Sequence, residues 1–248
     1  MIKGLVLLFL VNQAFAQEAS LQLNQANQLY RESQYEKAIA LYEQIASNGY
    51  EDGALYYNLG NAYYKLKNIP AAILNFERAK RLAPHDDDIL YNLRLANIRV
   101  TDKIEPVPRL FIIEWWNSFI GTFSTGIWAV VAIVALWCAA LGAILFRISK
   151  STLGQRVGFL VCALCIIVSI IGYIGVGQQY RKEYIDQAGI IFSPTVAVKS
   201  SPDAQSTDLF VLHEGVRVDV LDTVGDWKKI RLADGKVGWM TSADLRVI

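Results

Sequence analysis

Residues 53–84 read GALYYNLGNAYYKLKNIPAAILNFERAKRLAP, and this stretch decides the fold of the N-terminal part of the chain. Comparing the sequence with itself gives a period of about 34 residues, a length typical of helix-turn-helix repeats. One period earlier, a weaker copy begins at Ala19, with Gln22 and Gln25 where apolar residues would be expected. Two copies predict two pairs of helices, in which small residues such as Gly60 and Ala72 allow the helices to approach closely.

The period and its spacing resemble the tetratricopeptide repeat (TPR) family. One period after the stronger copy, Arg94 and Asn97 stand where that family has a small residue and an aromatic residue. Asp86, Asp87 and Asp88 suit the start of a helix through capping and the helix dipole, so we expect one end helix that closes an array over residues 17–105. The stronger copy fills every signature position of the family: Tyr56, Leu59, Gly60, Tyr63, Ala72, Phe76, Ala79 and Pro84.

The TPR resemblance also implies a binding surface, because the first helix of each pair lines a concave groove in that family. The mixture of rings, amides and cations at these positions suits an extended peptide or a partner helix, although the rings could instead simply cover helix surface. TPR domains that clamp carboxyl termini have a lysine where this chain has Leu23, so that function is not implied. The partner-binding candidates are Asn27, Tyr30, Arg31, Tyr57, Asn61, Tyr64 and Lys65, joined on the end helix by Tyr91, Leu95 and Ile98.

Two long stretches without Asp, Glu, Lys or Arg follow the repeats, at residues 115–146 and 157–180. Each is longer than the roughly 20 residues that cross a hydrocarbon core about 30 Å thick. They predict two transmembrane helices, and buried helices of a soluble protein are the alternative. Tryptophan and phenylalanine side chains at the start of the first stretch are expected at headgroup depth: Trp115, Trp116 and Phe119.

The charges around these stretches predict which side of the membrane each part occupies. The loop at residues 147–156 contains Arg147, Lys150 and Arg156 and no acidic residue, so we expect it to be cytoplasmic. Residues 1–16 resemble a signal peptide that ends in Ala14-Phe15-Ala16, and an uncleaved anchor is the alternative. Both signals place the N- and C-terminal domains in the periplasm, with the chain in the inner membrane.

From about residue 188 the hydrophobic period changes to two, which predicts an all-β domain over residues 188–248. Short strands and the Asp234-Gly235 hairpin turn favour a small antiparallel barrel. The order of its turns and aromatics resembles bacterial SH3 domains. Trp227 and Trp239 are the candidate anchors, either in the core or in a ligand groove. The resemblance implies a protein partner or peptidoglycan stem peptides as ligands.

Composition excludes several function classes. With a formal net charge of +1 and no basic cluster, the chain lacks the surface that nucleic acids need. We find no nucleophile motif, phosphate loop or metal-ligand spacing, and therefore expect no enzymatic activity, no cofactor and no metal site. Cys162 and Cys165 form a C-x-x-C within the second apolar stretch, where packing is favoured over a redox role.

The sequence thus predicts a multidomain membrane protein with an all-α TPR array, two transmembrane helices and an SH3-like barrel. In this order, the parts resemble the BatE-like family of the Bacteroides aerotolerance (Bat) operon. That resemblance implies a membrane complex with von Willebrand A-domain proteins and a MoxR-type ATPase, linked to stress tolerance. We therefore expect a scaffold for protein partners, and an envelope sensor that binds peptidoglycan is the alternative.

Overall fold

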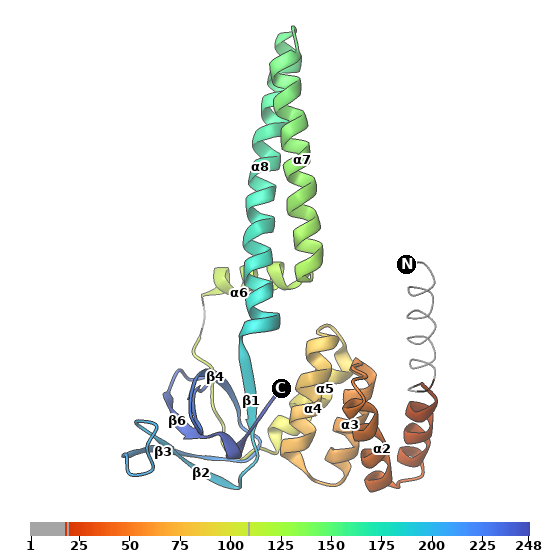
Figure 1. The fold of residues 1–248 in the computed structure, drawn as a ribbon, viewed down its shortest axis with the longest axis vertical. Coiled ribbons are helices and arrows are strands. Elements are labelled where there is room, and N and C mark those ends of the chain that lie inside the picture. The colour runs from red at the N-terminus through yellow and green to blue at the C-terminus, as the bar shows by residue number, and fades with distance from the viewer. Residues whose placement is uncertain (1–17, 19, 109) are drawn as a thin grey trace, which may run out of the picture. The chain divides into compact units, whose positions relative to one another are not determined.

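The computed structural model describes residue 18, residues 20–108 and residues 110–248 (Figure 1). The expected signal peptide, residues 1–16, lies outside the described residues. The chain divides into two compact units. Unit 1 combines the chain up to Val107 with Gln187–Ile248, and unit 2 is Pro108–Asp186. The array and the barrel therefore belong to one unit, although the apolar helices separate them in sequence.

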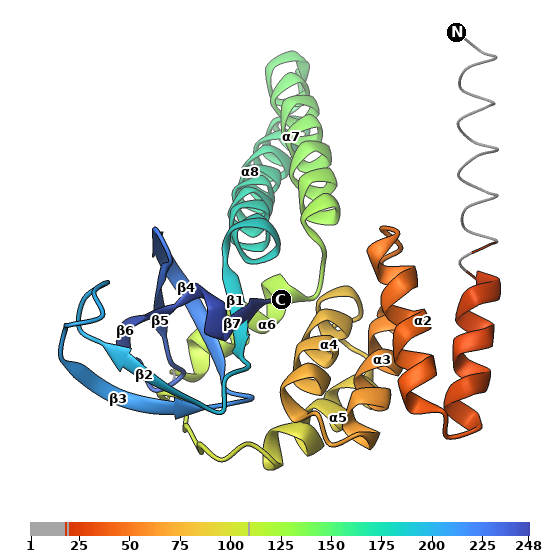
Figure 2. The ribbon, with the colours of Figure 1, turned by 60° about the horizontal axis from the view of Figure 1, so that its bottom comes forward.

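The N-terminal part of unit 1 is a stack of helices, as the period predicts. Residues 20–31 form its first helix. Side chains that accept hydrogen bonds from the first turn begin three of the later helices: Asp52, Asn68 and Asp86. The helices that follow are α2 (Tyr35–Ser47), α3 (Gly53–Lys65), α4 (Ile69–Leu82) and α5 (Asp87–Ile98) (Figure 2).

Close packing inside the second pair depends on Gly60. A Cβ atom at Gly60 would lie 2.7 Å from the ring of Phe76, which is itself only 1% exposed. One period earlier, Ala26 and Tyr42 occupy the same two positions and are both fully buried. The small residue of each pair thus makes room for the ring that fills the space between the two helices.

The β part of unit 1 is a seven-stranded sheet in which all paired strands are antiparallel, in the order β3-β2-β6-β5-β4-β1-β7. Side chains from its inner face form the core, including Ile190, Val198, Val218, Ile230 and Met240. The strands are β1 (Gln187–Ile191), β2 (Thr195–Lys199), β3 (Asp208–His213), β4 (Arg217–Val224), β5 (Trp227–Arg231), β6 (Val237–Thr241) and β7 (Leu245–Val247).

The end of the helix stack shares a hydrophobic core with the barrel. Ile73 on α4 and Val100 after α5 pack with barrel residues such as Val216. Val100 comes so close to the barrel that a Cβ at Gly215 would lie 3.0 Å from its Cγ2 atom, and Gly215 also has φ +87°. The helix α5 is thus present as expected, but Leu93, Ala96 and Val100 at the end of the array lie in a core shared with the barrel.

Unit 2 contains three helices and not the two that the uncharged stretches predict. They are α6 (Phe111–Gly121), α7 (Thr125–Ile148) and α8 (Thr152–Tyr180), followed by a π-helical turn at Arg181–Ile185. The stretch at residues 115–146 is thus interrupted, because the chain leaves the helical conformation at Ser124, which has φ −70° and ψ 162°. By length and composition, α7 and α8 are able to cross a membrane.

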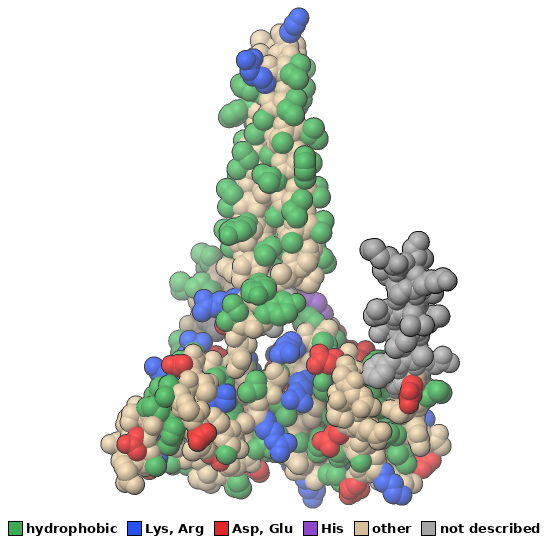
Figure 3. Space-filling model, in the orientation of Figure 1, with side chains coloured by type: hydrophobic (Ala, Val, Ile, Leu, Met, Phe, Trp, Pro, Cys, Tyr) green, Lys and Arg blue, Asp and Glu red, His purple; other side chains and the backbone are tan. Residues whose placement is uncertain are grey.

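The two long helices pack closely against each other. A Cβ at Gly142 would lie 2.8 Å from the main-chain nitrogen of Cys162, and one at Gly158 would lie 2.5 Å from that of Phe146. Figure 3 shows apolar side chains along the outer surface of this hairpin and Lys and Arg side chains at its tip. The turn between the helices is short, Ser149–Ser151, and the three basic residues of the expected loop lie in it and in the adjoining turns.

Candidate functional site: the groove of the helix stack

The helix stack encloses a groove of about 330 Å³ between its α3 and α5 helices. Three tyrosine rings line it, half-buried, and the side chain of Lys65 lies at its rim, exposed. Among the described residues that line the groove, Lys65 alone is charged. The lining residues are Tyr30, Tyr57, Asn61, Tyr64, Lys65, Phe76, Asn92 and Leu95.

Two of the predicted partner-binding residues have other surroundings. The Oδ1 atom of Asn27 accepts hydrogen bonds from the Tyr42 hydroxyl at 2.6 Å and from Asn58 Nδ2 at 3.0 Å. Asn27 therefore joins the first helix of the stack to α2 through Tyr42 and to α3 through Asn58. Arg31 is exposed and does not line the groove. On the end helix, Leu95 lines the groove, whereas Tyr91 and Ile98 are exposed to solvent.

Asn92 is a groove residue that the sequence analysis missed. Its Nδ2 atom donates to the Tyr57 hydroxyl at 3.0 Å and to Asn61 Oδ1 at 2.8 Å. The bond to Asn61 repeats, one period later, the bond from Asn58 to Asn27. The same self-comparison that reveals the repeats would have found this asparagine pair. By using both hydrogens of its amide, Asn92 fixes the two side chains between which it lies.

Two phenol groups, that of Tyr30 in the groove and that of Tyr42 beside it, have raised pKa values and stay neutral at physiological pH. Burial, followed by the nearby Tyr35 and Tyr57, raises the pKa of Tyr30 above its ordinary value. Burial, more than the neighbouring Tyr30, raises the pKa of Tyr42 to about 12. The groove offers tyrosine hydroxyls and ring faces together with one cation, a combination suited to hydrogen bonding, stacking and attraction of an anionic group.

Trp227 and Trp239 lie on the outer face of the barrel and are half-buried. Side chains alternate along a strand, and the inward-facing positions of the same two strands include Ile230 and Met240, which are fully buried. Of the two alternatives for these tryptophans, the structure excludes the core. Trp239 pairs across strands with Lys199 and Lys229, and the Nζ atom of Lys229 lies 5.9 Å from the centre of its ring.

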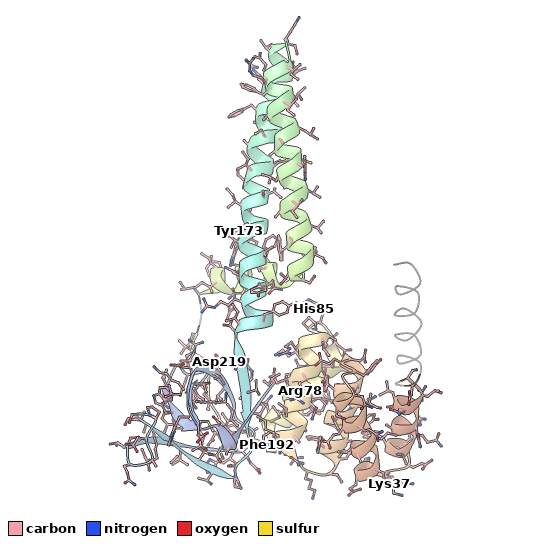
Figure 4. The ribbon with its side chains drawn as sticks, in the orientation of Figure 1. Lys37, Arg78, His85, Tyr173, Phe192 and Asp219 are labelled. Atoms are coloured by element: carbon pink, nitrogen blue, oxygen red, sulfur yellow. The ribbon has the colours of Figure 1, made fainter. Side chains whose placement is uncertain are left out.

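Polar contacts hold the groove and the tryptophan face in one unit. Arg78 on α4 donates to the main-chain oxygen of Val247 at 3.1 Å, and Arg81 donates to that of Ile248 at 3.0 Å. Asp102 accepts from the main-chain nitrogen of His213 at 2.7 Å, and its other oxygen lies 2.9 Å from His213 Nδ1. Figure 4 labels Arg78 on the helix side of this junction. These contacts couple the position of the array to that of the barrel.

The described residues contain no cluster of side chains that could bind a metal ion. Within residues 18, 20–108 and 110–248, no group of three or more His, Cys, Asp or Glu side chains is placed to hold a metal ion. Cys138, Cys162 and Cys165 are free thiols, half-buried on the two long helices of unit 2.

Comparison with protein families agrees with the division of unit 1. Residues 23–87 match the family model described as Tetratricopeptide repeat, and residues 194–246 match the model described as Bacterial SH3 domain. No curated protein matches the chain. The two matches fall on the helix stack and on strands β2–β7. The chain therefore contains tetratricopeptide repeats and a bacterial SH3 domain.

Proposed function

We propose that the protein is a non-enzymatic scaffold of the inner membrane, in which the TPR groove docks an extended segment of a protein partner. The observation that supports this most strongly is the groove of three half-buried tyrosines, two asparagines and Lys65. Tyrosine supplies a large contact area at a small cost in side-chain entropy and can also form hydrogen bonds. Asn92 orients Tyr57 and Asn61 in advance, which lowers the entropic cost of binding.

Lys65 indicates the chemistry of the segment that the groove would take. As the single charge among the described lining residues, it favours a partner segment that presents a carboxylate near one end of the groove. The three rings favour apolar or aromatic side chains alongside that carboxylate. We therefore propose an acidic, aromatic-containing extended peptide as the ligand class.

Membrane insertion of α7 and α8 is the second part of the proposal. The side chains of these helices are largely exposed along their length, including Leu136 and Leu164, which are 61% and 63% exposed. An apolar surface of this extent is unfavourable in water and favourable in hydrocarbon. Arg147, Lys150 and Arg156 near the hairpin turn favour a cytoplasmic tip and periplasmic N- and C-terminal domains. A cleaved signal peptide at residues 1–16 would be consistent with that orientation.

The resemblance to the BatE-like family supports a narrower proposal. It suggests that the partners belong to a Bat-type stress or aerotolerance complex, with von Willebrand A-domain membrane proteins and a MoxR-type ATPase. The order of repeats, apolar hairpin and SH3 domain is the feature on which this narrower proposal depends.

Co-purification from solubilised membranes tests the docking proposal. We expect the triple variant Tyr57→Ala/Asn61→Ala/Tyr64→Ala to lose its protein partners at least about tenfold, which corresponds to about 1.4 kcal/mol of binding free energy. A matched variant, Glu36→Ala/Lys37→Ala/Gln44→Ala, changes three exposed residues of α2 and should retain them. Circular dichroism of both variants reports whether the helices are intact. Equal recovery of partners by a folded groove variant would contradict the proposal.

A second candidate function is favoured by the outward position of Trp227 and Trp239. Two half-exposed indole rings with Lys199 and Lys229 beside Trp239 could bind peptidoglycan, through the rings and through the carboxylates of stem peptides. Sedimentation of the full chain in detergent with purified sacculi tests this. If the barrel is the binding site, Trp227→Ala/Trp239→Ala abolishes sedimentation, whereas the triple groove variant still sediments. If the wild-type chain stays in the supernatant, the peptidoglycan function is excluded.

A further inference from the structure

Helix α6 presents an apolar surface that no described part of unit 2 covers. Phe111 and Trp115 are 77% and 67% exposed, although α6 is too short, at 11 residues, to cross a membrane. On a helical wheel of about 100° per residue, the apolar side chains occupy roughly 200° of the circumference. The polar residues share the remaining arc: Glu114, Asn117 and Ser118.

The turn between α6 and α7 is held in place by specific hydrogen bonds. Trp128 on α7 donates from Nε1 to the main-chain oxygen of Ile120 at 2.9 Å. Gln179 on α8 donates from Nε2 to the main-chain oxygen of Phe123 at 2.8 Å, and Gln179 is only 7% exposed. The first bond satisfies a carbonyl group that the end of α6 leaves without a helical partner, and the second satisfies a carbonyl group of the turn itself. The change of direction after α6 is therefore a built feature of the hairpin.

The apolar side of α6 is continuous with the hairpin. Figures 1 and 2 show α6 crossing the foot of α7 and α8, and Phe119 packs edge-on against Trp128 at a centroid distance of 5.5 Å. Ile120, which is buried, lies within the apolar arc. The arc with Glu114 and Asn117 lies opposite on the wheel. An apolar arc that joins two apolar helices at their end, with a polar arc facing the other way, matches the boundary between acyl chains and water.

The residue types on α6 fit this boundary in particular. Trp115 and Phe119 stack with centroids 6.0 Å apart and an interplanar angle of 12°. Tryptophan prefers the headgroup region of a bilayer, because its ring is apolar and its N–H can still reach a polar partner. A second protein is disfavoured as the occupant, because the surface of α6 runs directly into side chains of α7 and α8 that lipid would surround.

We propose that α6 lies in the plane of the membrane, with its apolar arc in the headgroup–acyl boundary and its polar arc toward water. This inference rests on the proposed insertion of α7 and α8. Held by Trp128 and Gln179, α6 would set the depth of the hairpin and prevent it from sliding along the membrane normal. The aromatic residues predicted as anchors at the start of a span thus belong to a separate interfacial helix.

Spin labels attached to single cysteines test the proposal in the full chain, reconstituted in phosphatidylethanolamine–phosphatidylglycerol vesicles. Cys138, Cys162 and Cys165 are first replaced by alanine. Labels are then placed at Phe111→Cys and Trp115→Cys on the apolar arc, and at Asn117→Cys on the polar arc. Leu136→Cys, in the middle of α7, serves as the reference for the bilayer interior. The accessibility of each label to oxygen, which concentrates in lipid, is compared with its accessibility to a water-soluble nickel chelate.

We expect the labels at 111 and 115 to have oxygen-to-nickel ratios several-fold above that at 117 and below that at 136. If 111, 115 and 117 are all open to nickel while 136 is deep, α6 lies in water and the proposal is wrong, although membrane insertion stands. If 115 and 117 are equally deep, α6 continues the span and the proposal is again wrong. If 136 is itself open to nickel, insertion fails, and the proposed membrane function fails with it.

Discussion

The two repeats place different rings at the same position, Tyr42 in the first and Phe76 in the second, and their surroundings differ accordingly. In the first repeat, the hydroxyl of Tyr42 and the amide of Asn58 both bind Asn27. In the second, Phe76 has no hydroxyl, and Asn61 instead joins Asn92 at the wall of the groove. The asparagine position occupied by Asn27 thus joins helices of the stack in the first copy, whereas its equivalent, Asn61, lines the proposed docking groove in the second.

The largest expected effect is on stability, when the ring of Phe76 or that of Tyr42 is removed. Phe76→Ala should destabilise unit 1 by about 3–5 kcal/mol, because it leaves a cavity in a core shared with the barrel. Tyr42→Ala should cost a similar amount but affect mainly the first pair, because Tyr42 belongs to a separate core. Hydrogen–deuterium exchange of the full chain in nanodiscs, read separately for helices and strands, measures both. If Tyr42→Ala deprotects the barrel as strongly as Phe76→Ala does, the two cores are not separate.

The next largest effect should distinguish the pair Asn92–Asn61 from the equivalent pair Asn58–Asn27. Asn92→Ala removes two hydrogen bonds, and we expect a loss of about 1–2 kcal/mol in the stability of α3 and α5. Asn58→Ala removes the one bond to Asn27, and we expect a loss of about 1 kcal/mol or less. Partner binding should fall only in Asn92→Ala, because only that variant frees Tyr57 and Asn61. An equal loss of binding in the two variants would contradict this division of roles.

The smallest effect should appear at alkaline pH. The pKa of Tyr42 is raised by burial from 10.0 to about 12, so the folded state favours the neutral phenol. The resulting stability is complete below about pH 10, where the unfolded chain is also neutral, and is lost as the pH rises toward 12. Tyr42→Phe should lower the melting temperature at pH 7, because it removes a hydrogen bond worth about 1 kcal/mol. Above pH 10 its melting temperature should fall less steeply than that of the wild type.

The melting temperature of Tyr42→Phe should still fall somewhat above pH 10, because other tyrosines also have raised pKa values. The pKa values of Tyr56 and Tyr63 are also raised, in both cases chiefly by burial. The matched variant Tyr91→Phe changes an exposed ring and should keep the wild-type profile. Thermal melting followed by circular dichroism between pH 8 and pH 11 compares the three proteins. Parallel profiles for wild type and Tyr42→Phe would show that Tyr42 is not held neutral by the fold.

Local periodicity in the sequence was enough to predict the repeats, the barrel and most of the groove. The period of the repeats places Tyr30 and Tyr64 at equivalent positions, and the helix stack keeps that equivalence. Alternation of valines predicted the strand β4, whose Val218 is buried as expected. These features depend on residues close in sequence, and for that reason a pattern can reveal them.

The features that were missed depend on contacts between distant residues. Arg78 meets Val247 across 169 positions of sequence, so no local pattern indicates that the array joins the barrel. The break after α6 depends on Gln179, which is 56 positions from its acceptor at Phe123. The side of the sheet on which Trp227 and Trp239 lie depends on strand register. For that reason the sequence could not decide whether these side chains belong to the core or to a groove.

The central claim, that the second repeat forms the docking surface, can be tested most directly by photo-crosslinking in living cells. A benzophenone amino acid is placed at Tyr64 in the groove or at Lys37, which is exposed on α2 at the edge of the array away from the barrel (Figure 4). We predict that position 64 gives a discrete crosslinked protein that disappears when Asn92→Ala is added, and that position 37 gives none. Crosslinking of the same protein from position 37 alone would contradict the claim.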